Sequence, residues 1–264
     1  MTSTSNPTAA IMIIGDEILS GRTLDSNVNT IAKFLAALGI DLNEVRMVRD
    51  VEEQIVSAVV ALSSAYDYVF TTGGIGPTHD DITADAMATA FGVGISEHPE
   101  ALRVLQERAD KMGWELNANS RRMARIPDGA SLIKNPVSAA PGFQINNVFV
   151  MAGVPKIMEG MLSDVAPRLK TGRKVLSRTL KLSYVGESWA ADALRDIDNR
   201  YADLSLGSYP FGLGQGEFGT QLVVRGQNAE SLDAAVSELK AALEPVISEG
   251  RKRNPEARLE EITA

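Results

Sequence analysis

Apolar runs of strand length alternate with amphipathic helical patterns from Ala9 to about Lys170, and this alternation most constrains the fold. The run from Ala9 to Ile14 is uninterrupted and ends at Gly15, as is typical of a strand buried on both faces of a parallel sheet. Successive strand patterns joined by helix patterns imply right-handed crossovers. The sequence therefore predicts an α/β fold: a three-layer, mostly parallel sheet with helices on both faces. We expect further strands at 40–48, 66–71, 131–133 and 143–151, and further helices at 26–38, 52–64, 82–91, 99–112 and from Pro155 onward.

A change of pattern at Leu169–Lys174 predicts a linker. Beyond it the order becomes strand, helix, strand, strand, helix, which indicates a small α+β (βαββα) domain with an antiparallel portion. We therefore expect four segments: a flexible amino terminus at 1–8, the α/β domain at 9–170, the α+β domain at 175–248 and a flexible tail at 249–264.

The 264 residues include 26 basic and 34 acidic side chains, and the net charge is −8. A nucleic-acid scaffold needs clustered Lys and Arg to neutralise phosphates, so this balance predicts no nucleic-acid partner. Cysteine is absent, which excludes disulfides, zinc thiolates and thiol nucleophiles and fits a reducing cytoplasm. We see no apolar run of membrane-spanning length and no signal peptide, so we expect a cytoplasmic protein without a membrane partner.

Three glycines follow the third predicted strand within four residues. Gly73, Gly74 and Gly76 let backbone N–H groups approach an oxyanion closely, and the N-terminus of the next helix adds a favourable dipole. Asp80 and Asp81 come next, and adjacent carboxylates repel a bare phosphate unless a divalent cation lies between them. The segment therefore predicts a site for a phosphorylated ligand with a metal. The structural alternative is a tight turn capped by one of the two aspartates.

A second polar segment follows the first predicted strand. Gly15 ends that strand, Asp16 and Glu17 come next, and hydroxyl and amide groups continue to Asn27. Because the carboxyl ends of parallel strands meet at one edge of a sheet, we expect acids of this segment to share one hard cation, such as Mg²⁺, with those of the glycine turn. The alternative is a solvated loop whose last residues cap the next helix, and for Asn27 both interpretations stay open.

Two further segments carry polar side chains. The segment 117–127 contains three arginines and predicts a helix with an exposed basic face. Lys134 and Asn135 stand beside a turn between two predicted strands, where Lys134 either pairs with a phosphate or lies in solvent. His79 adjoins the two aspartates of the glycine turn, so a proton transfer or a ligand contact is open to it.

Six segments carry a resemblance to known proteins: Gly15–Asn27, Gly73–Thr83, Asn119–Pro127, Lys134–Gly142, Gly186–Ser188 and Gly207–Pro210. The first two resemble the MoaB/Mog-type molybdopterin-binding domain. More closely, the set looks like the amino-terminal part of the CinA (competence/damage-inducible protein A) family, whose small second domain is marked by the last two segments. The resemblance covers nearly the whole chain from Ala9 to about Val246.

The resemblance implies a three-layer α/β domain that binds a phosphorylated pterin (molybdopterin) or a nucleotide. Carried over by motif, the metal end is formed by Asp16, Glu17, Asp80 and Asp81, and the catalytic candidates are Asp81, Asp80 and Glu17. The implied ligand contacts are Gly15, Gly73, Gly74, Gly76, Thr78, Asn27, Lys134 and Asn135. Related proteins commonly form dimers or trimers, so the expected partners are a small phosphorylated ligand and further copies of the chain.

Similar domains with the CinA arrangement cleave nucleotide pyrophosphates such as ADP-ribose with a divalent metal. The enzyme form of this hypothesis is thus a metal-dependent pyrophosphatase acting on ADP-ribose- or FAD-like diphosphates. Two loops depart from the family pattern: Ser138-Ala139 replaces Gly-Thr, and 152–155 reads Ala-Gly-Val-Pro in place of Pro-Gly-Pro-Pro. The amidohydrolase domain of full-length members has no counterpart in these 264 residues. The two loops favour the alternative of a module that binds its ligand without turnover, and a pure interaction protein is the third hypothesis.

Overall fold

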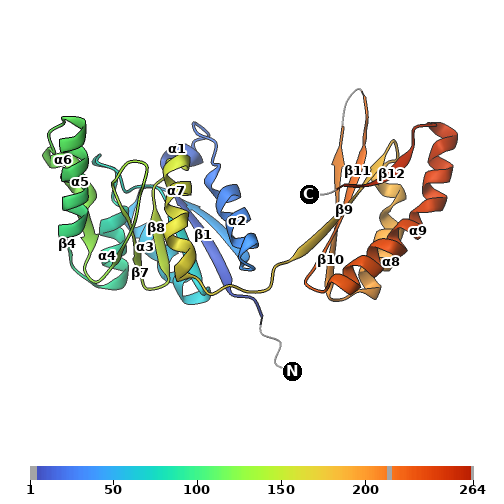
Figure 1. Ribbon diagram of the computed structural model, residues 1–264, viewed down its shortest axis with the longest axis horizontal. Helices are drawn as coiled ribbons and strands as arrows, with labels where there is room; N and C mark the ends of the chain where they lie inside the picture. The colour runs from blue at the N-terminus through green and yellow to red at the C-terminus, as the bar shows by residue number, and fades with distance from the viewer. Residues whose placement is uncertain (1–4, 213–215, 263–264) are drawn as a thin grey trace. The chain divides into compact units, whose positions relative to one another are not determined.

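Residues 5–212 and 216–262 are described by the computed structural model. The chain forms two compact units, Met1–Gly172 (unit 1) and Arg173–Ala264 (unit 2), and each has its own sheet and its own hydrophobic core (Figure 1). None of the described helices combines the length and the apolar composition that crossing a membrane requires.

Unit 1 is built on a six-stranded sheet in the order β2-β1-β3-β8-β7-β6. The pairs β1–β2, β1–β3 and β3–β8 are parallel, whereas β7 pairs antiparallel with both β8 and β6. The strands of the unit are β1 (Thr8–Ile14), β2 (Asp41–Val48), β3 (Tyr68–Thr72), β6 (Ser131–Ile133), β7 (Gly142–Ile145) and β8 (Val148–Met151), with a separate pair β4 (Ile95–Glu97) and β5 (Arg125–Pro127). The predicted mostly parallel α/β sheet is confirmed.

Helices cover both faces of this sheet (Figure 1). They are α1 (Asp16–Leu19), α2 (Asn27–Ala37), α3 (Glu52–Ala65), α4 (Thr83–Phe91), α5 (Pro99–Met112), α6 (Ala118–Arg121) and α7 (Pro155–Val165), with 3-10 turns at Arg122–Ala124 and Ala166–Arg168. Helices α2 and α7 share one core with Ile11 and Ile13 of β1, and α3, α4 and α5 share the other core with Met12 and Ile14. Because successive side chains of a strand point to opposite faces, the unbroken apolar run of β1 supplies both cores.

The segment predicted as one strand at 143–151 is instead a hairpin made of β7 and β8. Asn146 in its turn has a φ of 51°, in the left-handed region that asparagine tolerates better than most residues. The side chain of Asn147 donates to the carbonyls of Ser63 and Tyr66, each at 2.9 Å, and so fastens the turn to the end of α3. The prediction is wrong because the Asn-Asn pair interrupts the apolar run and reverses the chain.

The segment 117–127, predicted as a helix with a basic face, contains only one helical turn, α6, before the 3-10 turn and β5. Two of its three arginines are paired: Arg121 with Glu97 at 2.5 Å and Arg125 with Asp85 at 2.6 Å. The predicted basic face is therefore wrong. Both partners are remote in sequence, 24 and 40 residues away, so a local pattern does not reveal them.

Unit 2 is a four-stranded antiparallel sheet in the order β10-β11-β9-β12 with two helices. Its elements are β9 (Leu176–Ser183), a 3-10 turn (Glu187–Trp189), α8 (Ala191–Arg200), β10 (Leu204–Phe211), β11 (Gly219–Gly226), α9 (Ala229–Arg253) and β12 (Arg258–Ile262). Strands and helices pack through one core that includes Leu180, Leu222 and Leu239. The predicted separate α+β domain with an antiparallel sheet is confirmed.

The amino-terminal stretch predicted to be flexible at 1–8 is held in place over its described part. Residues 1–4 lie outside the described residues. Asn6 is buried and donates to the carboxylate of Asp41 at 3.2 Å, and Thr8 already belongs to β1. The register of β1 beside β2 begins at Thr8, and the carbonyl of Pro7 accepts the N–H of Asp41 at 2.9 Å, so 6–8 are hydrogen-bonded to the first residue of β2.

The tail predicted to be flexible at 249–264 is ordered up to residue 262, and 263–264 lie outside the described residues. Helix α9 continues to Arg253, and β12 then pairs antiparallel with β9. Ala257 is buried in the core of unit 2, and its carbonyl accepts a hydrogen bond from Arg251 at 3.1 Å. The polar composition of 251–255 conceals a turn that returns the chain to the edge of the sheet, so the sequence pattern alone does not indicate β12.

Removing residues 255–264 is expected to lower the free energy of unfolding of unit 2 by about 2–4 kcal/mol. The deletion removes the buried Ala257 and the ladder between β12 and β9. Calorimetry of the full chain should then show the unfolding temperature of unit 2 reduced by roughly 10 °C or more. Lys252→Ala, which breaks only an exposed ion pair with Glu249, is the control and should cost less than about 0.5 kcal/mol. An unchanged unfolding temperature after truncation would show that β12 contributes no stability.

Candidate functional site

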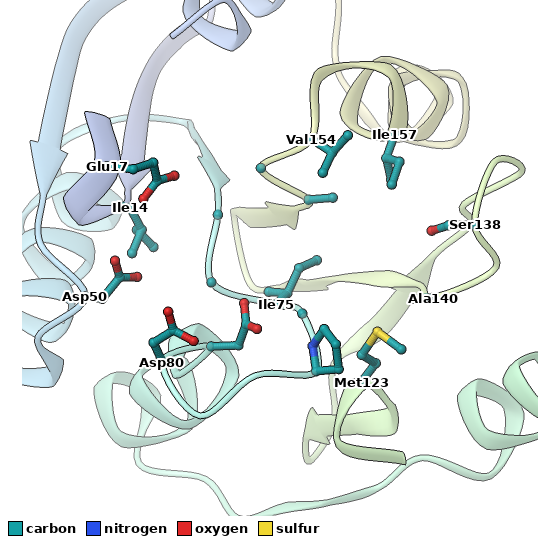
Figure 2. A pocket seen from close by; sticks show the side chains of 18 of the residues that line it. Ile14, Glu17, Asp50, Ile75, Asp80, Met123, Ser138, Ala140, Val154 and Ile157 are labelled. Carbon is teal, nitrogen blue, oxygen red and sulfur yellow. The ribbon is translucent and has the colours of Figure 1, made fainter. Parts of the chain in front are cut away.

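The carboxyl ends of β1, β2, β3 and β8 meet at one edge of the sheet of unit 1, because these strands run parallel. The loops that follow them surround an open cavity of about 610 Å³ (Figure 2). Its wall is formed by Ile14, Gly15, Glu17, Thr23, Asp50, 73–77, Asp80, Asp81, Met123, Asn135, Ser138, Ala140, 152–155 and Ile157. Most of the predicted site residues line this cavity, whereas Asp16, Asn27, Thr78 and Lys134 do not.

The glycine turn, residues 73–76, has a backbone that other residues rarely adopt. Gly73 and Gly74 have φ values of 107° and 66°. Thr83 joins the turn to α4, because its hydroxyl donates to the carbonyl of Gly73 at 2.9 Å and its N–H to that of Gly74 at 3.0 Å. A Cβ atom on Gly73 would lie 2.1 Å from the carbonyl oxygen of Ile14. Glycine thus lets the turn approach β1 and leaves its main chain at the wall of the cavity.

Asp81 shapes the glycine turn from its far end. Its Oδ2 accepts hydrogen bonds from the N–H of Thr78 at 2.8 Å and from the Thr78 hydroxyl at 2.6 Å. The same oxygen lies 2.6 Å from the place that a Cβ atom of residue 76 would occupy, so a larger residue than Gly76 would displace the Asp81 carboxylate. Asp81 therefore closes a tight turn, as the structural alternative proposed, and its carboxylate lines the cavity as well.

A carboxylate that the sequence analysis did not single out, Asp50, lines the cavity together with Glu17 and Asp80 (Figure 2). Its Oδ2 accepts the N–H of Asp16 at 2.9 Å, which orients the group. Burial raises the pKa of Asp50, and the negative charges of Glu17, Asp16 and Asp80 raise it further. The signal that could have found it is its position, because Asp50 follows the end of β2 by two residues, as Asp16 follows the end of β1.

Asp16, predicted as a cation ligand, does not line the cavity. Its two carboxylate oxygens accept hydrogen bonds from the Arg49 guanidinium at 2.8 and 3.0 Å, and this pairing lowers the pKa of Asp16. The ion pair fastens α1 to the loop after β2, where Asp50 holds the Asp16 N–H. The guanidinium of Arg49 therefore neutralises the carboxylate of Asp16 outside the cavity. The cavity wall contains the carboxylate of Asp50 instead of that of Asp16.

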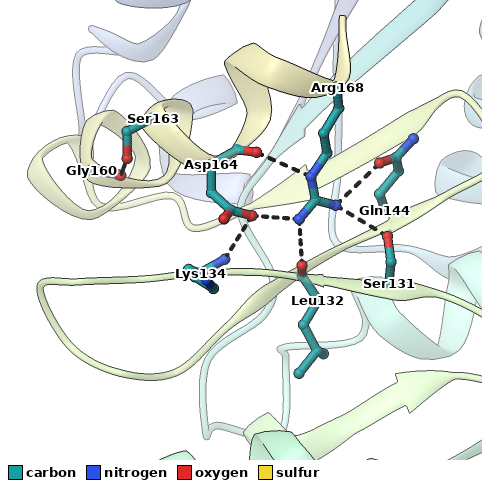
Figure 3. A network of polar contacts seen from close by, with 8 residues as sticks. All are labelled: Ser131, Leu132, Lys134, Gln144, Gly160, Ser163, Asp164 and Arg168. Atoms are coloured by element: carbon teal, nitrogen blue, oxygen red, sulfur yellow. Dashed lines mark hydrogen bonds and ion pairs between the residues drawn. The ribbon is translucent and has the colours of Figure 1, made fainter.

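Lys134, predicted to approach the ligand, also lies outside the cavity wall. Its backbone N–H donates to the carboxylate of Asp164 at 3.3 Å, and Asp164 forms an ion pair with Arg168 (Figure 3). Arg168 donates in addition to the carbonyl of Leu132 at 2.6 Å and to side chains of β6 and β7. This network fastens the end of α7 to the antiparallel strands, so the main chain at Lys134 belongs to the frame of the site.

Asn27 lies behind the cavity wall. Its side chain is 3% exposed, and its amide donates to the carbonyl of Gly153 at 2.8 Å and to the hydroxyl of Thr72 at 3.4 Å. Within the described part of the chain, the Oδ1 atom of Asn27 has no hydrogen-bond partner. Asn27 thus connects the start of α2 with the end of β3 and with the loop before α7, which is a positioning role.

A loop wound around Asn135 forms the wall that faces the carboxylates. Asn135 is 8% exposed, and its Oδ1 accepts the N–H groups of Val137 and Ser138, each at 3.0 Å. Its amide donates to the Ser138 hydroxyl at 2.6 Å and to the carbonyl of Ala140 at 2.8 Å. These bonds hold Ala139, between their endpoints, at a φ of 71°, where residues other than glycine are uncommon. The polar atoms of the Asn135 side chain are therefore engaged in hydrogen bonds that fix the shape of the loop.

As far as the structure describes the chain, the cavity wall carries four carboxylates, Glu17, Asp50, Asp80 and Asp81, and no Lys, Arg or His. Among residues 5–212 and 216–262, no three Asp, Glu, His or Cys side chains come close enough together to hold a metal ion by themselves. Mg²⁺ commonly takes only one or two carboxylates and completes its shell with phosphate and water oxygens. The wall therefore suits a cation that arrives with a phosphorylated ligand better than a resident metal.

Comparison with known families agrees with this architecture. Residues 10–171 match the family described as "Probable molybdopterin binding domain", which is more than half of the chain. The chain belongs to this molybdopterin-binding domain family. A second match, to the family described as "FAD synthase, middle domain", covers residues 174–250 of unit 2.

This chain is also similar to CinA-like proteins. A CinA-like protein of Gemmatimonas aurantiaca is 34% identical over 244 residues, which cover 88% of this chain and 56% of that protein. A protein of Aeropyrum pernix is 34% identical and is matched over 91% of this chain and 92% of its own length. The crystal structure of the protein CinA from Thermoplasma acidophilum has a TM-score of 0.57 and 31% identity over 62% of this chain and 99% of its own. The chain spans about half the length of the CinA-like proteins it matches, 56% in one case and 46% in another.

Proposed function

We propose that the cavity of unit 1 binds a small phosphorylated ligand, a nucleotide or a phosphorylated pterin, together with a divalent cation such as Mg²⁺. The observation that carries the proposal is the composition of the wall, in which the described residues combine an open glycine turn with four carboxylates, while the arginines nearest to them, Arg22 and Arg49, line an adjoining hollow. Main-chain N–H groups of such a turn suit phosphate oxygens. The carboxylates repel those oxygens unless a cation lies between them. The pterin class agrees with the family that unit 1 matches, whose description names molybdopterin binding.

A second function, hydrolysis of a nucleotide diphosphate, is favoured by Asp50. Hydrolysis adds water across the P–O–P bond and leaves two phosphate monoesters, so a base must take a proton from the water. A bound cation neutralises charge on the diphosphate during this reaction. Asp50 is oriented by the Asp16 N–H, and burial together with neighbouring acids raises its pKa, which makes its carboxylate a stronger base than an ordinary aspartate.

Titration calorimetry of the full chain with AMP, ADP-ribose, molybdopterin and adenosine, each in Mg²⁺ and in EDTA, tests the binding proposal. Adenosine is the matched control because it lacks only the phosphate of AMP. We expect AMP to bind at least about tenfold more tightly than adenosine in Mg²⁺, a difference of ~1.4 kcal/mol or more. Molybdopterin binding at least about tenfold more tightly than AMP would make the pterin the ligand class. Equal affinity for adenosine and AMP, or no binding of any ligand, would contradict the proposal.

Turnover is tested separately with ADP-ribose and FAD in the presence of Mg²⁺, Ni²⁺ or Co²⁺, by chromatography of the mononucleotide products. If Asp50 is the base, Asp50→Asn should reduce the rate by about 10²-fold or more while the variant stays folded. Measurable binding without any product would leave the binding function standing and refute the hydrolase.

A further inference from the structure

We propose that the outer face of helices α2 and α7 is the contact surface of a homodimer, in which a second copy of the chain docks by two-fold symmetry. In this dimer Lys33 of each copy pairs with Glu159 of the other. The inference goes beyond the proposed function, because the surface shares no residue with the cavity wall and its contact requires no ligand.

An open groove runs between α2 and α7, which lie side by side on one face of the sheet of unit 1 (Figure 1). Its volume is about 580 Å³. The groove has an apolar floor, because Leu162 is 5% exposed and Phe34 is partly buried against the same core. Polar or small side chains form the rest of its lining: Asn29, Thr30 and Lys33 from α2, Glu159 and Ser163 from α7, and Ala166 directly after α7. An apolar centre with a polar rim is the usual composition of a protein–protein interface.

Two large apolar side chains are exposed just before the two helices. Leu24, three residues before the first residue of α2, is 93% exposed, and Val154, directly before α7, is 56% exposed. The loop that carries Leu24 is held in place, because the carboxylate of Asp25 accepts the N–H of Val28 at 2.9 Å. Apolar surface that is fixed and exposed beside a groove favours association, since contact with a partner removes it from water.

The two walls of the groove carry opposite charges, Lys33 on α2 and Glu159 on α7, and both residues are exposed. In the part of the chain that the structure describes, neither side chain forms an ion pair or a hydrogen bond. A two-fold axis through the middle of the groove places Lys33 of each copy against Glu159 of the other, because each contact of an isologous interface occurs twice. A partner with a patch of one sign would be attracted by one of these residues and repelled by the other. The charges of the groove therefore favour a second copy of the chain over an unrelated protein.

The oligomeric state of the full chain, measured by sedimentation over a range of protein concentrations, tests the inference. We expect a monomer–dimer equilibrium in the wild type. Lys33→Glu replaces both attractive pairs by repulsive ones and should raise the dissociation constant of the dimer about tenfold or more. The double variant Lys33→Glu with Glu159→Lys restores opposite charges in exchanged positions, and its dissociation constant should return to within about threefold of the wild type. Lys111→Glu makes the same charge change at the exposed end of α5 and is the matched control, with an unchanged dissociation constant.

Mixing the two single variants tests the two-fold pairing itself. Lys33→Glu has two acidic residues in its groove, and Glu159→Lys has two basic ones, so each should dimerise poorly alone. In a mixed dimer of the two variants, both cross-copy pairs are attractive again. We therefore expect the equimolar mixture to dimerise about as tightly as the wild type. A mixture of Glu159→Lys with Lys111→Glu has the same total charge but only one attractive pair, and it should dimerise more weakly.

A wild type that stays monomeric at every concentration would overturn the inference. A dimer that is unaffected by Lys33→Glu would overturn it as well, because the contact would then lie on another face. A trimer, or a mixture of the two single variants that dimerises no better than either alone, would overturn the two-fold pairing. None of these measurements includes a ligand, so their failure leaves the proposed function of the cavity to its own test.

Discussion

Replacing Gly73 by alanine is expected to lower the unfolding temperature of unit 1 by roughly 8 °C or more and to abolish nucleotide binding. At a φ of 107° an alanine is strained whatever the space around it. Its Cβ would also lie 2.1 Å from the carbonyl oxygen of Ile14, a main-chain atom of β1, which has a strand on each side in the sheet. Moving Gly73 away would break the bond of its N–H to the Met151 carbonyl, at 3.2 Å, and separate the turn from β8. Strain and clash should together cost more than about 3 kcal/mol.

The variant Gly92→Ala measures the destabilisation that comes from a left-handed backbone alone, without a steric clash of the added Cβ. Gly92 has a φ of 65° after the last residue of α4, and the space that its Cβ would occupy is open. We expect this substitution to cost only the ~1–2 kcal/mol of a left-handed residue other than glycine, and to leave ligand affinity unchanged. Calorimetric scans of both variants and titrations with AMP in Mg²⁺ make the comparison. If Gly73→Ala lost no more stability than Gly92→Ala, the close approach of the turn to β1 would not be the reason for glycine at this position.

Elements with strong local signals could be predicted from the sequence. The unbroken apolar run of β1 indicates a strand buried on both faces, and the structure places it second in the sheet with a parallel strand on each side. Helix α5 begins at Pro99 and ends before Gly113, as a proline at the first position and a glycine after the last predict. Such signals depend on neighbours in sequence and on periodicity, so no tertiary contact is needed to read them.

The sequence predicts only some of the side chains that line the cavity, because the choice depends on contacts between residues that are distant in sequence. Asp16 and Asp50 stand at equivalent positions after two parallel strands, and nothing local distinguishes them. The choice is made by Arg49, which binds the carboxylate of Asp16, 33 residues away in sequence. The position of Lys134 likewise depends on a distant residue, because its backbone N–H is held by Asp164 of α7, and the approach of its side chain to a ligand stays a prediction. The roles of the acids in binding a metal stay predictions.

Asp50→Asn is expected to change the affinity for ADP-ribose in opposite directions with and without a divalent cation. In Mg²⁺ the variant lacks a negative charge that helps to hold the cation, so the affinity should fall about tenfold, or ~1.4 kcal/mol. In EDTA the bare diphosphate is repelled by Asp50, and removing that charge should raise the affinity several-fold. Two charges roughly 8 Å apart interact by about 2 kcal/mol at an effective dielectric constant near 20, which is large enough for either effect. An asparagine can still accept the Asp16 N–H through its Oδ1, so the loop keeps its anchor.

Asp128→Asn is the matched control, because it removes the same charge from an exposed aspartate that accepts from the Ser96 hydroxyl at 2.9 Å and does not line the cavity. It should leave the affinity unchanged in both buffers.

The stability of the Asp50→Asn variant supplies a second check. Because the pKa of Asp50 is raised in the folded state, its stabilising contribution is present at low pH and is lost as the pH rises through that pKa. At neutral pH the uncharged asparagine avoids this loss, so Asp50→Asn should unfold at the wild-type temperature or slightly above it. A shift of affinity in the same direction in Mg²⁺ and in EDTA would contradict a cation held between Asp50 and the phosphates.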